Sequence, residues 1–472
     1  MNDLFKINKM NIYLHIEISS RELDSKLLLA VLAAARGHKV VISSSEIIEK
    51  GLKKGWLPPG IFHTKSLTPG ENKIKRHQSI IDNGSKITSI DEESSIDRFG
   101  YEEFSKLRYS KETIDQSSAV FTWGDEDFEM LKKQYSDNSE KIFKTGSPRI
   151  DLWRPSISEY WDTPKSIPEK PFLLVSSNLA SIFERISLKE RIGIMKKGGY
   201  FDRSPGLLKE KFLRLSNDFN KAIIFTEAIK HLSKYNNGYD IVVRPHPIED
   251  IDMWKILLNG TPNVHVIREG AISSWVKKSF AVMHHACTTA IECTISNKPL
   301  VTYAASELED HLYQNNLSNQ LGYIVDTKEK LLDKINYLNQ LTQNENGKTT
   351  IQSLPPFVLK KVYIDKNELS AEKIVKIWEN ILNDKIYKPV NLTLLKIFIL
   401  KMNINRLMGD FLKIFFKSSL SSLGTKKNNQ KFPKINQTDI NLRIKKLQNL
   451  LKIKKKIEYK LISDRTLLIR CL

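Results

Sequence analysis

Short apolar runs alternate with longer helix-like stretches over most of the chain. Asn11–Ile18 is an apolar run of strand type, and Arg21–Arg36 contains LLLAVLAAA, a composition typical of a buried helix. Gly37 then favours a helix end, and Lys39–Ser43 is a second apolar strand. Strands that alternate with helices of this length predict a parallel sheet covered by helices on both faces.

The alternation resumes after a polar, proline-containing stretch, Arg154–Lys170, which we interpret as a linker between two domains. Further strands are predicted at 117–122, 141–144, 171–176, 240–243, 263–267, 280–284 and 299–303, and further helices at 221–233, 251–258, 272–278 and 288–296. We therefore predict an α/β protein. Two Rossmann-like, doubly wound domains, 1–155 and 156–386, would face a cleft, and a basic, amphipathic, helical tail, 387–472, would follow.

The tail carries most of the net charge of +20, because residues 391–472 contain 19 Lys and Arg against 4 Asp and Glu. This excess predicts a polyanionic partner, a membrane surface or nucleic acid; the alternative is a solvated tail with a lysine-rich composition. Polar residues recur at helical spacing on one face: Lys396, Asn403, Arg406, Asp410, Lys413 and Lys417. Such a helix suits a membrane interface or packs on the protein's own domains, and Lys452–Lys456 favours anionic lipid.

The composition excludes several classes of protein. With 40% apolar and 27% charged residues the chain has enough apolar material for a sizeable core. Three cysteines and no CxxC pair argue against a disulfide framework and a zinc site, so we expect no metal. MNDLFKINKMNIYLH lacks the apolar core of a signal peptide, and no apolar run is long enough to span a bilayer, so we expect a cytoplasmic protein.

The strongest candidate for chemistry is DIVVRPHP, an apolar strand that ends in two prolines flanking a histidine. Arg244 and His246 would lie at the carboxyl end of this strand, where their donors suit a phosphate group. The alternative is a capped turn with a solvated histidine.

A second candidate is FAVMHHACTTAIE, which predicts a strand, a short turn and a helix that begins at Thr288 and Thr289. Two hydroxyls and free backbone N–H groups at a helix start favour an anion. Glu292, one turn later, could accept hydrogen bonds from ribose hydroxyls; the alternative is an exposed helix carboxylate. We add Ser177 and Asn178, which directly follow another predicted strand, to this nucleotide- and phosphate-binding set.

In the first domain, Asp91, Glu92 and Glu93 form a carboxylate cluster. Mutual repulsion raises a carboxyl pKa toward the range of a general base; the alternative is a solvated loop. Other polar residues that we expect on the acceptor side or in the cleft are Glu17, Arg21, Glu22, His63, Lys65 and Arg149.

Together these segments resemble the bacterial surface carbohydrate (polysaccharide) biosynthesis family, from IEISSRELDSKLLLA through GIFHTKS, SIDEES, FTWG, TGSPRIDLWRP and RPHPIED to HHACTTAIE and NKPLVTY. The resemblance implies a GT-B glycosyltransferase whose second domain holds a nucleotide sugar. The chain is also similar to transferases that use CMP-activated sugars. Carried over to this chain, that similarity implies that the carboxylate cluster would supply the base. His246 would stabilise the leaving phosphate, and Thr288 and Thr289 would bind it. Ser94 departs from that pattern, which has glycine.

We therefore expect a metal-independent glycosyltransferase of surface polysaccharide or lipopolysaccharide assembly, without a cofactor. Its partners would be a nucleotide sugar, CMP-activated by the resemblance, a glycan or lipid-linked acceptor, and the anionic inner face of the membrane through the tail. One alternative is a nucleotide-sugar epimerase of the UDP-GlcNAc 2-epimerase type. Another is a non-catalytic carbohydrate- or nucleic-acid-binding protein. We expect no nucleic acid, because RPHP and CTTAIE at strand ends predict a phosphate pocket, which a nucleic-acid-binding arm does not require.

Overall fold

The computed structural model describes residues 9–92, 101–184, 187–197, 199–203, 206–308, 316–344, 354–382, 388–415 and 432–472. The chain divides into two compact units. Unit 1 contains the described residues up to Tyr160 together with those of Pro355–Leu472, and unit 2 contains the described residues of Trp161–Leu354.

Unit 1 is built on an eight-stranded sheet in the order β13-β14-β2-β1-β3-β4-β5-β6. Its strands are β1 (Asn11–His15), β2 (Lys39–Ser43), β3 (Ile61–Thr64), β4 (Lys86–Ile90), β5 (Ser117–Thr122), β6 (Ile142–Lys144), β13 (Ile457–Ser463) and β14 (Thr466–Cys471). Strands β1 to β6 are parallel to one another. Because β2 and β3 lie on opposite sides of β1, the strand order reverses between β1 and β3. This reversal is the topological switch point of unit 1.

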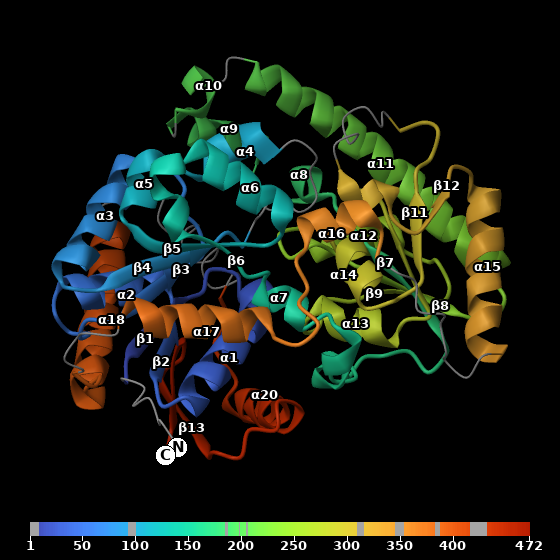
Figure 1. Cartoon of the computed structure of the whole chain (residues 1–472). Helices are drawn as coiled ribbons and strands as arrows, with labels where there is room; N and C mark the ends of the chain where they lie inside the picture. The colour runs from blue at the N-terminus through green and yellow to red at the C-terminus, as the bar shows by residue number, and fades with distance from the viewer. Residues whose placement is uncertain are drawn as a thin grey trace. The chain divides into compact units, whose positions relative to one another are not determined.

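Helices cover this sheet and bury its apolar side chains. They are α1 (Ser19–Ala35), α2 (Ser45–Lys53), α3 (Glu71–Asp82), α4 (Tyr101–Arg108), α5 (Lys111–Asp115), α6 (Asp125–Gln134), α7 (Pro148–Asp151), α16 (Pro356–Lys361), α17 (Ser370–Ile381), α18 (Leu392–Phe415) and α20 (Gln437–Leu450). Two 3₁₀ turns, η2 (Ser136–Lys141) and η3 (Pro155–Tyr160), complete the unit. Figure 1 shows α17 alongside α1, although the two helices are far apart in the sequence.

Unit 2 is built on six parallel strands in the order β12-β11-β10-β7-β8-β9. The strands are β7 (Phe172–Ser176), β8 (Asp240–Arg244), β9 (Val264–Val266), β10 (Ala281–His284), β11 (Leu300–Tyr303) and β12 (Tyr323–Val325). The helices are α8 (Ala180–Phe183), α9 (Leu188–Lys197), α10 (Tyr200–Arg203), α11 (Leu207–Tyr235), α12 (Ile251–Leu257), α13 (Ile272–Lys278), α14 (Thr289–Ile295) and α15 (Lys328–Asn344), with a 3₁₀ turn, η5 (Leu317–Gln320). In Figure 1, α11 runs beside α15. The strand order reverses between β7 and β10, which is the switch point of unit 2.

The predicted α/β class with two doubly wound parallel sheets is confirmed. The structure divides the chain differently from our expectation, however, because residues 355–382 belong to unit 1 and not to the domain expected at 156–386. The Asp151 carboxylate accepts hydrogen bonds from the backbone N–H groups of Ser370 (3.1 Å) and Ala371 (2.9 Å) and so caps α17. Gly146 has φ +77°, and a Cβ there would lie 2.5 Å from the carbonyl oxygen of Tyr363. The TGSPRID segment thus packs against residues 363–371, where the chain re-enters unit 1.

The tail is not wholly helical, which corrects our expectation. It ends in the hairpin β13–β14, and β14 pairs antiparallel with β2, Leu467 opposite Ile42. The apolar run TLLI in β14 is buried, so this strand extends the core of unit 1. The expected cleft between the two units stays a prediction.

Helix α18 packs on unit 1, which is one of the two roles that the sequence left open, and its place at a membrane interface stays a prediction. Its residues Leu395, Phe398 and Ile399 are buried in the core of unit 1, with the Phe398 ring stacked 5.7 Å from Trp56. A second row of apolar side chains on the same helix is exposed: Leu394, Ile397, Leu400, Ile404, Leu407 and Met408. In the described part of the chain, no helix has the length and apolar character needed to cross a membrane.

Candidate functional site

The switch point of unit 2 brings together the residues that follow β7 and β10. Ser176 ends β7, and its hydroxyl lies 3.2 Å from the Cys287 sulfur and 3.3 Å from the Thr289 hydroxyl. The Cys287 sulfur is itself 3.3 Å from Thr289. This arrangement follows from the parallel register, in which Ser176 pairs with His284 and the two strands end side by side. Polar groups from two distant segments therefore meet at one sheet edge.

The turn after β10 has a strained backbone. Ala286 has φ +53°, in the left-handed region that non-glycine residues rarely adopt. Two side-chain amides hold it: Asn178 Nδ2 donates to the Ala286 carbonyl oxygen (2.5 Å), and the Ala286 N–H donates to Asn319 Oδ1 (2.6 Å). Strain that is held in place from both sides is a feature of ligand-binding loops.

The two histidines of this turn are buried and neutral. Burial lowers the pKa of His284 to about 3, and its Nε2 lies 2.8 Å from the Thr302 hydroxyl. Burial and the nearby charge of Lys221 hold the pKa of His285 well below its usual range, and Asn319 lies 3.1 Å from its Nε2. Both rings support the turn and add no positive charge at neutral pH.

Ser177 joins the loop after β7 to the loop after β8. Its hydroxyl accepts a hydrogen bond from the His246 backbone N–H (3.0 Å) and donates one to Glu249 (2.5 Å). Glu249 is fully buried and also accepts from the Leu179 N–H (2.6 Å) and from Trp254 Nε1 (2.8 Å). Burial raises the pKa of Glu249 despite these bonds. The position of His246 is thus set by a buried network.

The His246 side chain is half-buried at the carboxyl end of β8. Its Nδ1 accepts a hydrogen bond from the Ile248 N–H (3.3 Å), so the neutral ring carries its proton on Nε2. The His246 carbonyl accepts from Arg268 (3.2 Å). The side chain is therefore oriented as a hydrogen-bond donor through Nε2.

Arg244 is committed to the protein itself. Its guanidinium donates to the carbonyl oxygens of Glu269 (2.6 Å) and Gly270 (3.0 Å) and lies 5.4 Å above the Trp275 ring. Burial, and then the charge of Arg268, lower its pKa to about 10. Arg244 positions the loop before α13, and its predicted contact with phosphate stays a prediction.

The helix predicted at 288–296 is present as α14, which begins at Thr289. Thr288 is exposed and Thr289 is buried against Ser176. Glu292 is also buried, so the alternative of an exposed helix carboxylate is wrong. Because α14 has only seven residues, its dipole contributes little to anion binding. Any anion bound here would be held mainly by the threonine hydroxyls.

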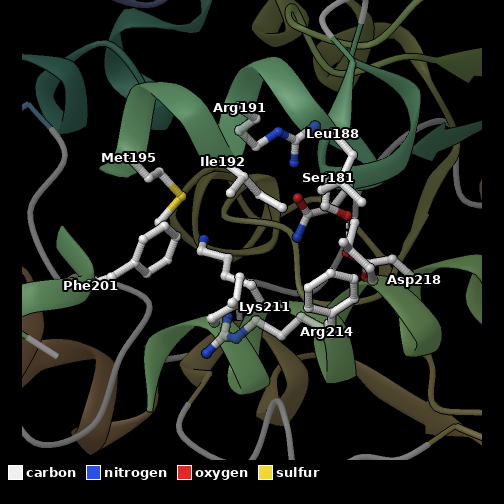
Figure 2. Close-up of a pocket in the computed structure, with 13 residues that line it drawn as sticks. Ser181, Leu188, Arg191, Ile192, Met195, Phe201, Lys211, Arg214 and Asp218 are labelled. Carbon is white, nitrogen blue, oxygen red and sulfur yellow. Dashed lines mark hydrogen bonds between the residues drawn. The ribbon is translucent and has the colours of Figure 1, made fainter. Parts of the chain in front are cut away.

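A cavity opens beside this edge, with an empty volume of about 790 Å³ that includes open solvent. Asn178 and Ser181 line it next to β7, and α9, α10 and α11 supply the rest of its wall. Ser181 donates a hydrogen bond to Asp218, which also pairs with Lys221 at 3.0 Å. Figure 2 shows Ser181 and Asp218 together at one side of the cavity.

The switch point of unit 1 has a different character. Glu17 follows β1 and forms an ion pair with Lys65, which follows β3. Glu22 is fully buried beneath them, accepting from the Glu17 N–H (2.8 Å) and from Arg21 (2.9 Å). His15 ends β1, and burial and then the charge of Lys65 lower its pKa to about 3. Acids and bases at this edge are matched with one another.

The carboxylate cluster is also paired. Both oxygens of Asp91 accept from Arg108, each at 2.7 Å. Glu92 forms a buried ion pair with Lys26 (2.7 Å). Burial alone would raise the pKa of Glu92, but the charges of Lys26 and Arg149 outweigh it and hold the pKa below its usual range. The expected raised pKa is thus wrong for Glu92, because its nearest charge is a cation. Glu93 lies outside the described residues.

Two further candidates of unit 1 have structural roles. His63 is fully buried, 3.0 Å from the Thr88 hydroxyl and between the rings of Phe121 and Trp378, and burial holds its pKa well below the usual range. Arg149 donates to the Glu92 carbonyl (3.1 Å) and lies 5.5 Å from the rings of Trp123 and Trp153.

The sequence reasoning missed Lys26 and Glu249. Lys26 directly precedes the apolar run LLLAVLAAA, and a cation in a helix of buried composition indicates a buried partner. Glu249 is the second residue after the Pro-His-Pro turn, and its sequence context predicts a solvated carboxylate. In the structure that carboxylate is hydrogen-bonded to Trp254 and Ser177. Among the described residues, no group of three His, Cys, Asp or Glu side chains is placed to hold a metal ion.

Comparisons with known proteins give structural likeness only. No family model matches the chain, and no curated protein does. A UDP-GlcNAc 2-epimerase from Methanocaldococcus jannaschii is similar at 14% identity and a TM-score of 0.44, covering 78% of this chain and 99% of that one. The Neisseria meningitidis UDP-GlcNAc 2-epimerase bound to UDP-GlcNAc has 11% identity, a TM-score of 0.43 and the same coverage. The wall teichoic acid polymerase TagF has 12% identity and a TM-score of 0.41, covering 80% and 90%. Likeness at this level does not bear on function.

Proposed function

We propose that the protein is a nucleotide-sugar enzyme, and specifically a glycosyltransferase of surface polysaccharide assembly. The observation that carries the proposal is the switch point of unit 2. There Ser177, Asn178, His246 and Thr289 meet beyond the carboxyl ends of parallel strands, the usual ligand position in such sheets. Neutral donors held by a buried network suit a phosphate that must be bound and then released.

In this proposal the acceptor hydroxyl attacks the anomeric carbon of the donor sugar. The bond from that carbon to the acceptor oxygen forms as its bond to the phosphate oxygen breaks, and the electron pair stays on the phosphate. The Nε2–H of His246 would donate a hydrogen bond to that oxygen, where negative charge develops. A carboxylate of unit 1 would take the hydroxyl proton. Of the described candidates, Glu17 fits better than Asp91 or Glu92, because its side chain is about one-third exposed (32%) and theirs are buried.

The donor and the acceptor are proposed on separate grounds. The resemblance favours a CMP-activated sugar. The exposed apolar row of α18, flanked by Lys396 and Lys401, supports an acceptor at an anionic membrane surface, because such a helix face binds at the lipid interface.

Sugar transfer from CMP-, UDP-, GDP- and CDP-activated donors to isolated membranes tests the proposal. We expect consumption of one donor, and a loss of turnover of about 10²- to 10⁴-fold in His246→Ala. His265→Ala is the matched control, since His265 is an exposed histidine on β9, 3.2 Å from Asp240. Unchanged turnover in His246→Ala would contradict the proposal. Epimerisation of UDP-GlcNAc without any acceptor would establish the epimerase instead.

A further inference from the structure

The cavity beside the switch point of unit 2 has a wall that is largely apolar. Side chains from α9, α10 and α11 form most of this wall: Leu188, Ile192, Met195, Phe201, Leu208, Phe212 and Leu215. Several of them are well exposed, with Phe212 at 50%, Leu188 at 39% and Leu208 at 38%. Open apolar surface in a concavity marks a place where an apolar ligand is bound.

The same cavity is lined by three cations and one acid. Lys211 and Arg214 come from α11, Arg191 comes from α9, and Asp218 is the acid. Arg191 and Arg214 also form ion pairs with Glu184 (3.1 Å) and Glu210 (3.0 Å). Figure 2 shows Arg191 and Lys211 directed toward the space between the two helices. A negatively charged group would be held there at the polar end of an apolar site.

We propose that this cavity binds a phosphorylated lipid with one phosphate end near Lys211 and its hydrocarbon chain against the apolar wall. A nucleotide fits less well, because ribose and base carry many polar groups that seven apolar side chains would leave without partners. The inference rests on the proposed function and deepens it, because the lipid would be the carrier of the acceptor. Asn178 and Ser181 connect the cavity to the edge where we place the donor.

Binding of farnesyl phosphate to the full chain, measured by isothermal titration calorimetry without any nucleotide, tests the proposal. Farnesol lacks the charge and inorganic phosphate lacks the chain, so each should bind at least about tenfold more weakly. Because no donor is present, failure here is distinguishable from failure of sugar transfer.

Two pairs of variants on α11 locate the site. Lys211→Ala should weaken farnesyl phosphate about tenfold and leave farnesol unchanged, whereas Lys209→Ala should change neither, because Lys209 is exposed outside the cavity. Phe212→Ala should weaken both ligands about tenfold, whereas Phe219→Ala should change neither, because Phe219 is 58% exposed and does not line the cavity.

Three results would overturn the proposal. One is equal binding of farnesyl phosphate by the cavity variants and their controls. Another is competition by CMP or UDP for the same site, which would make it part of the nucleotide site. The third is loss of farnesyl phosphate binding on changing Ile397→Ser in α18, which would assign the lipid to the tail.

Discussion

The two sheets have the same kind of switch point but place opposite chemistry there. In unit 1 the edge holds charges that are paired with one another, Glu17 with Lys65 and Lys26 with Glu92. In unit 2 the corresponding edge holds hydroxyls, an amide and neutral histidines around a strained turn at Ala286. The fold alone does not decide what a switch point binds.

From this difference we propose separate tasks for the two edges. A buried ion pair balances its own charge and is poorly suited to a ligand that comes and goes, because removing a partner leaves a charge uncompensated. At the edge of unit 2, Ser177 and Asn178 hold the His246 loop and the Ala286 turn through neutral hydrogen bonds. A negatively charged ligand can bind there without breaking an ion pair. We therefore propose phosphate binding in unit 2 and proton transfer in unit 1.

Of the changes that test this difference between the two edges, replacement of Lys26 should have the largest effect on stability. Lys26→Met leaves the buried Glu92 carboxylate without its cation, which should cost about 3–5 kcal/mol in the free energy of opening of unit 1. Amide hydrogen exchange in peptides spanning β1 and α1 measures this quantity.

The double variant Lys26→Met/Glu92→Leu should recover most of the loss, because no unpaired charge remains. Lys50→Met is the control: its pair with Glu46 is exposed, so protection should not change measurably. Equal losses in the single and double variants would show that packing of Lys26, and not its charge, stabilises the edge.

Acidification should have a smaller effect, and it should lower the stability of unit 2 at the edge that holds His284. His284 stays neutral in the folded protein down to about pH 3, whereas an unfolded histidine takes up a proton below about pH 6.5. The unfolded state then binds more protons, so stability is lost as the pH falls through 6.5. Between pH 7 and pH 5 the loss should be about 2 kcal/mol for this one group.

Hydrogen exchange at β10, corrected for the intrinsic rate at each pH, gives the measurement. His284→Gln should lose less stability than the wild type on acidification, because the buried neutral imidazole is gone. The pair of Lys26 with Glu92 should persist at pH 5, because the lowered pKa of Glu92 delays its protonation to more acidic pH. Parallel losses in the wild type and His284→Gln would show that His284 does not titrate as its burial requires.

The local pattern was enough to predict most strands and the class of fold. Lys39–Ser43 and Ser117–Thr122 were predicted with their observed bounds, because short apolar runs between turns carry a strong signal. The placing of Ser177, Thr289 and His246 at one edge followed from strand ends in a parallel sheet, a rule of topology that needs no side-chain detail.

Long-range pairings could not be predicted. Lys26 and Glu92 are 66 residues apart, and Asp151 and Ser370 are 219 apart. Nothing local distinguishes a carboxylate that will meet a cation from one that will repel a neighbour, so the pKa of Glu92 was predicted in the wrong direction. The hairpin of the tail was missed because its apolar strand Thr466–Cys471 gains its meaning only from pairing with β2.

The most direct test of the account is a hydrogen-exchange footprint of the full chain with and without a saturating nucleotide, CMP and UDP in turn. We predict added protection in peptides covering Ser176–Leu179 and His284–Glu292. We predict no change in peptides covering His15–Lys26 or Ser89–Glu92. Protection at the edge of unit 1, with none at the edge of unit 2, would contradict the assignment of phosphate binding to unit 2.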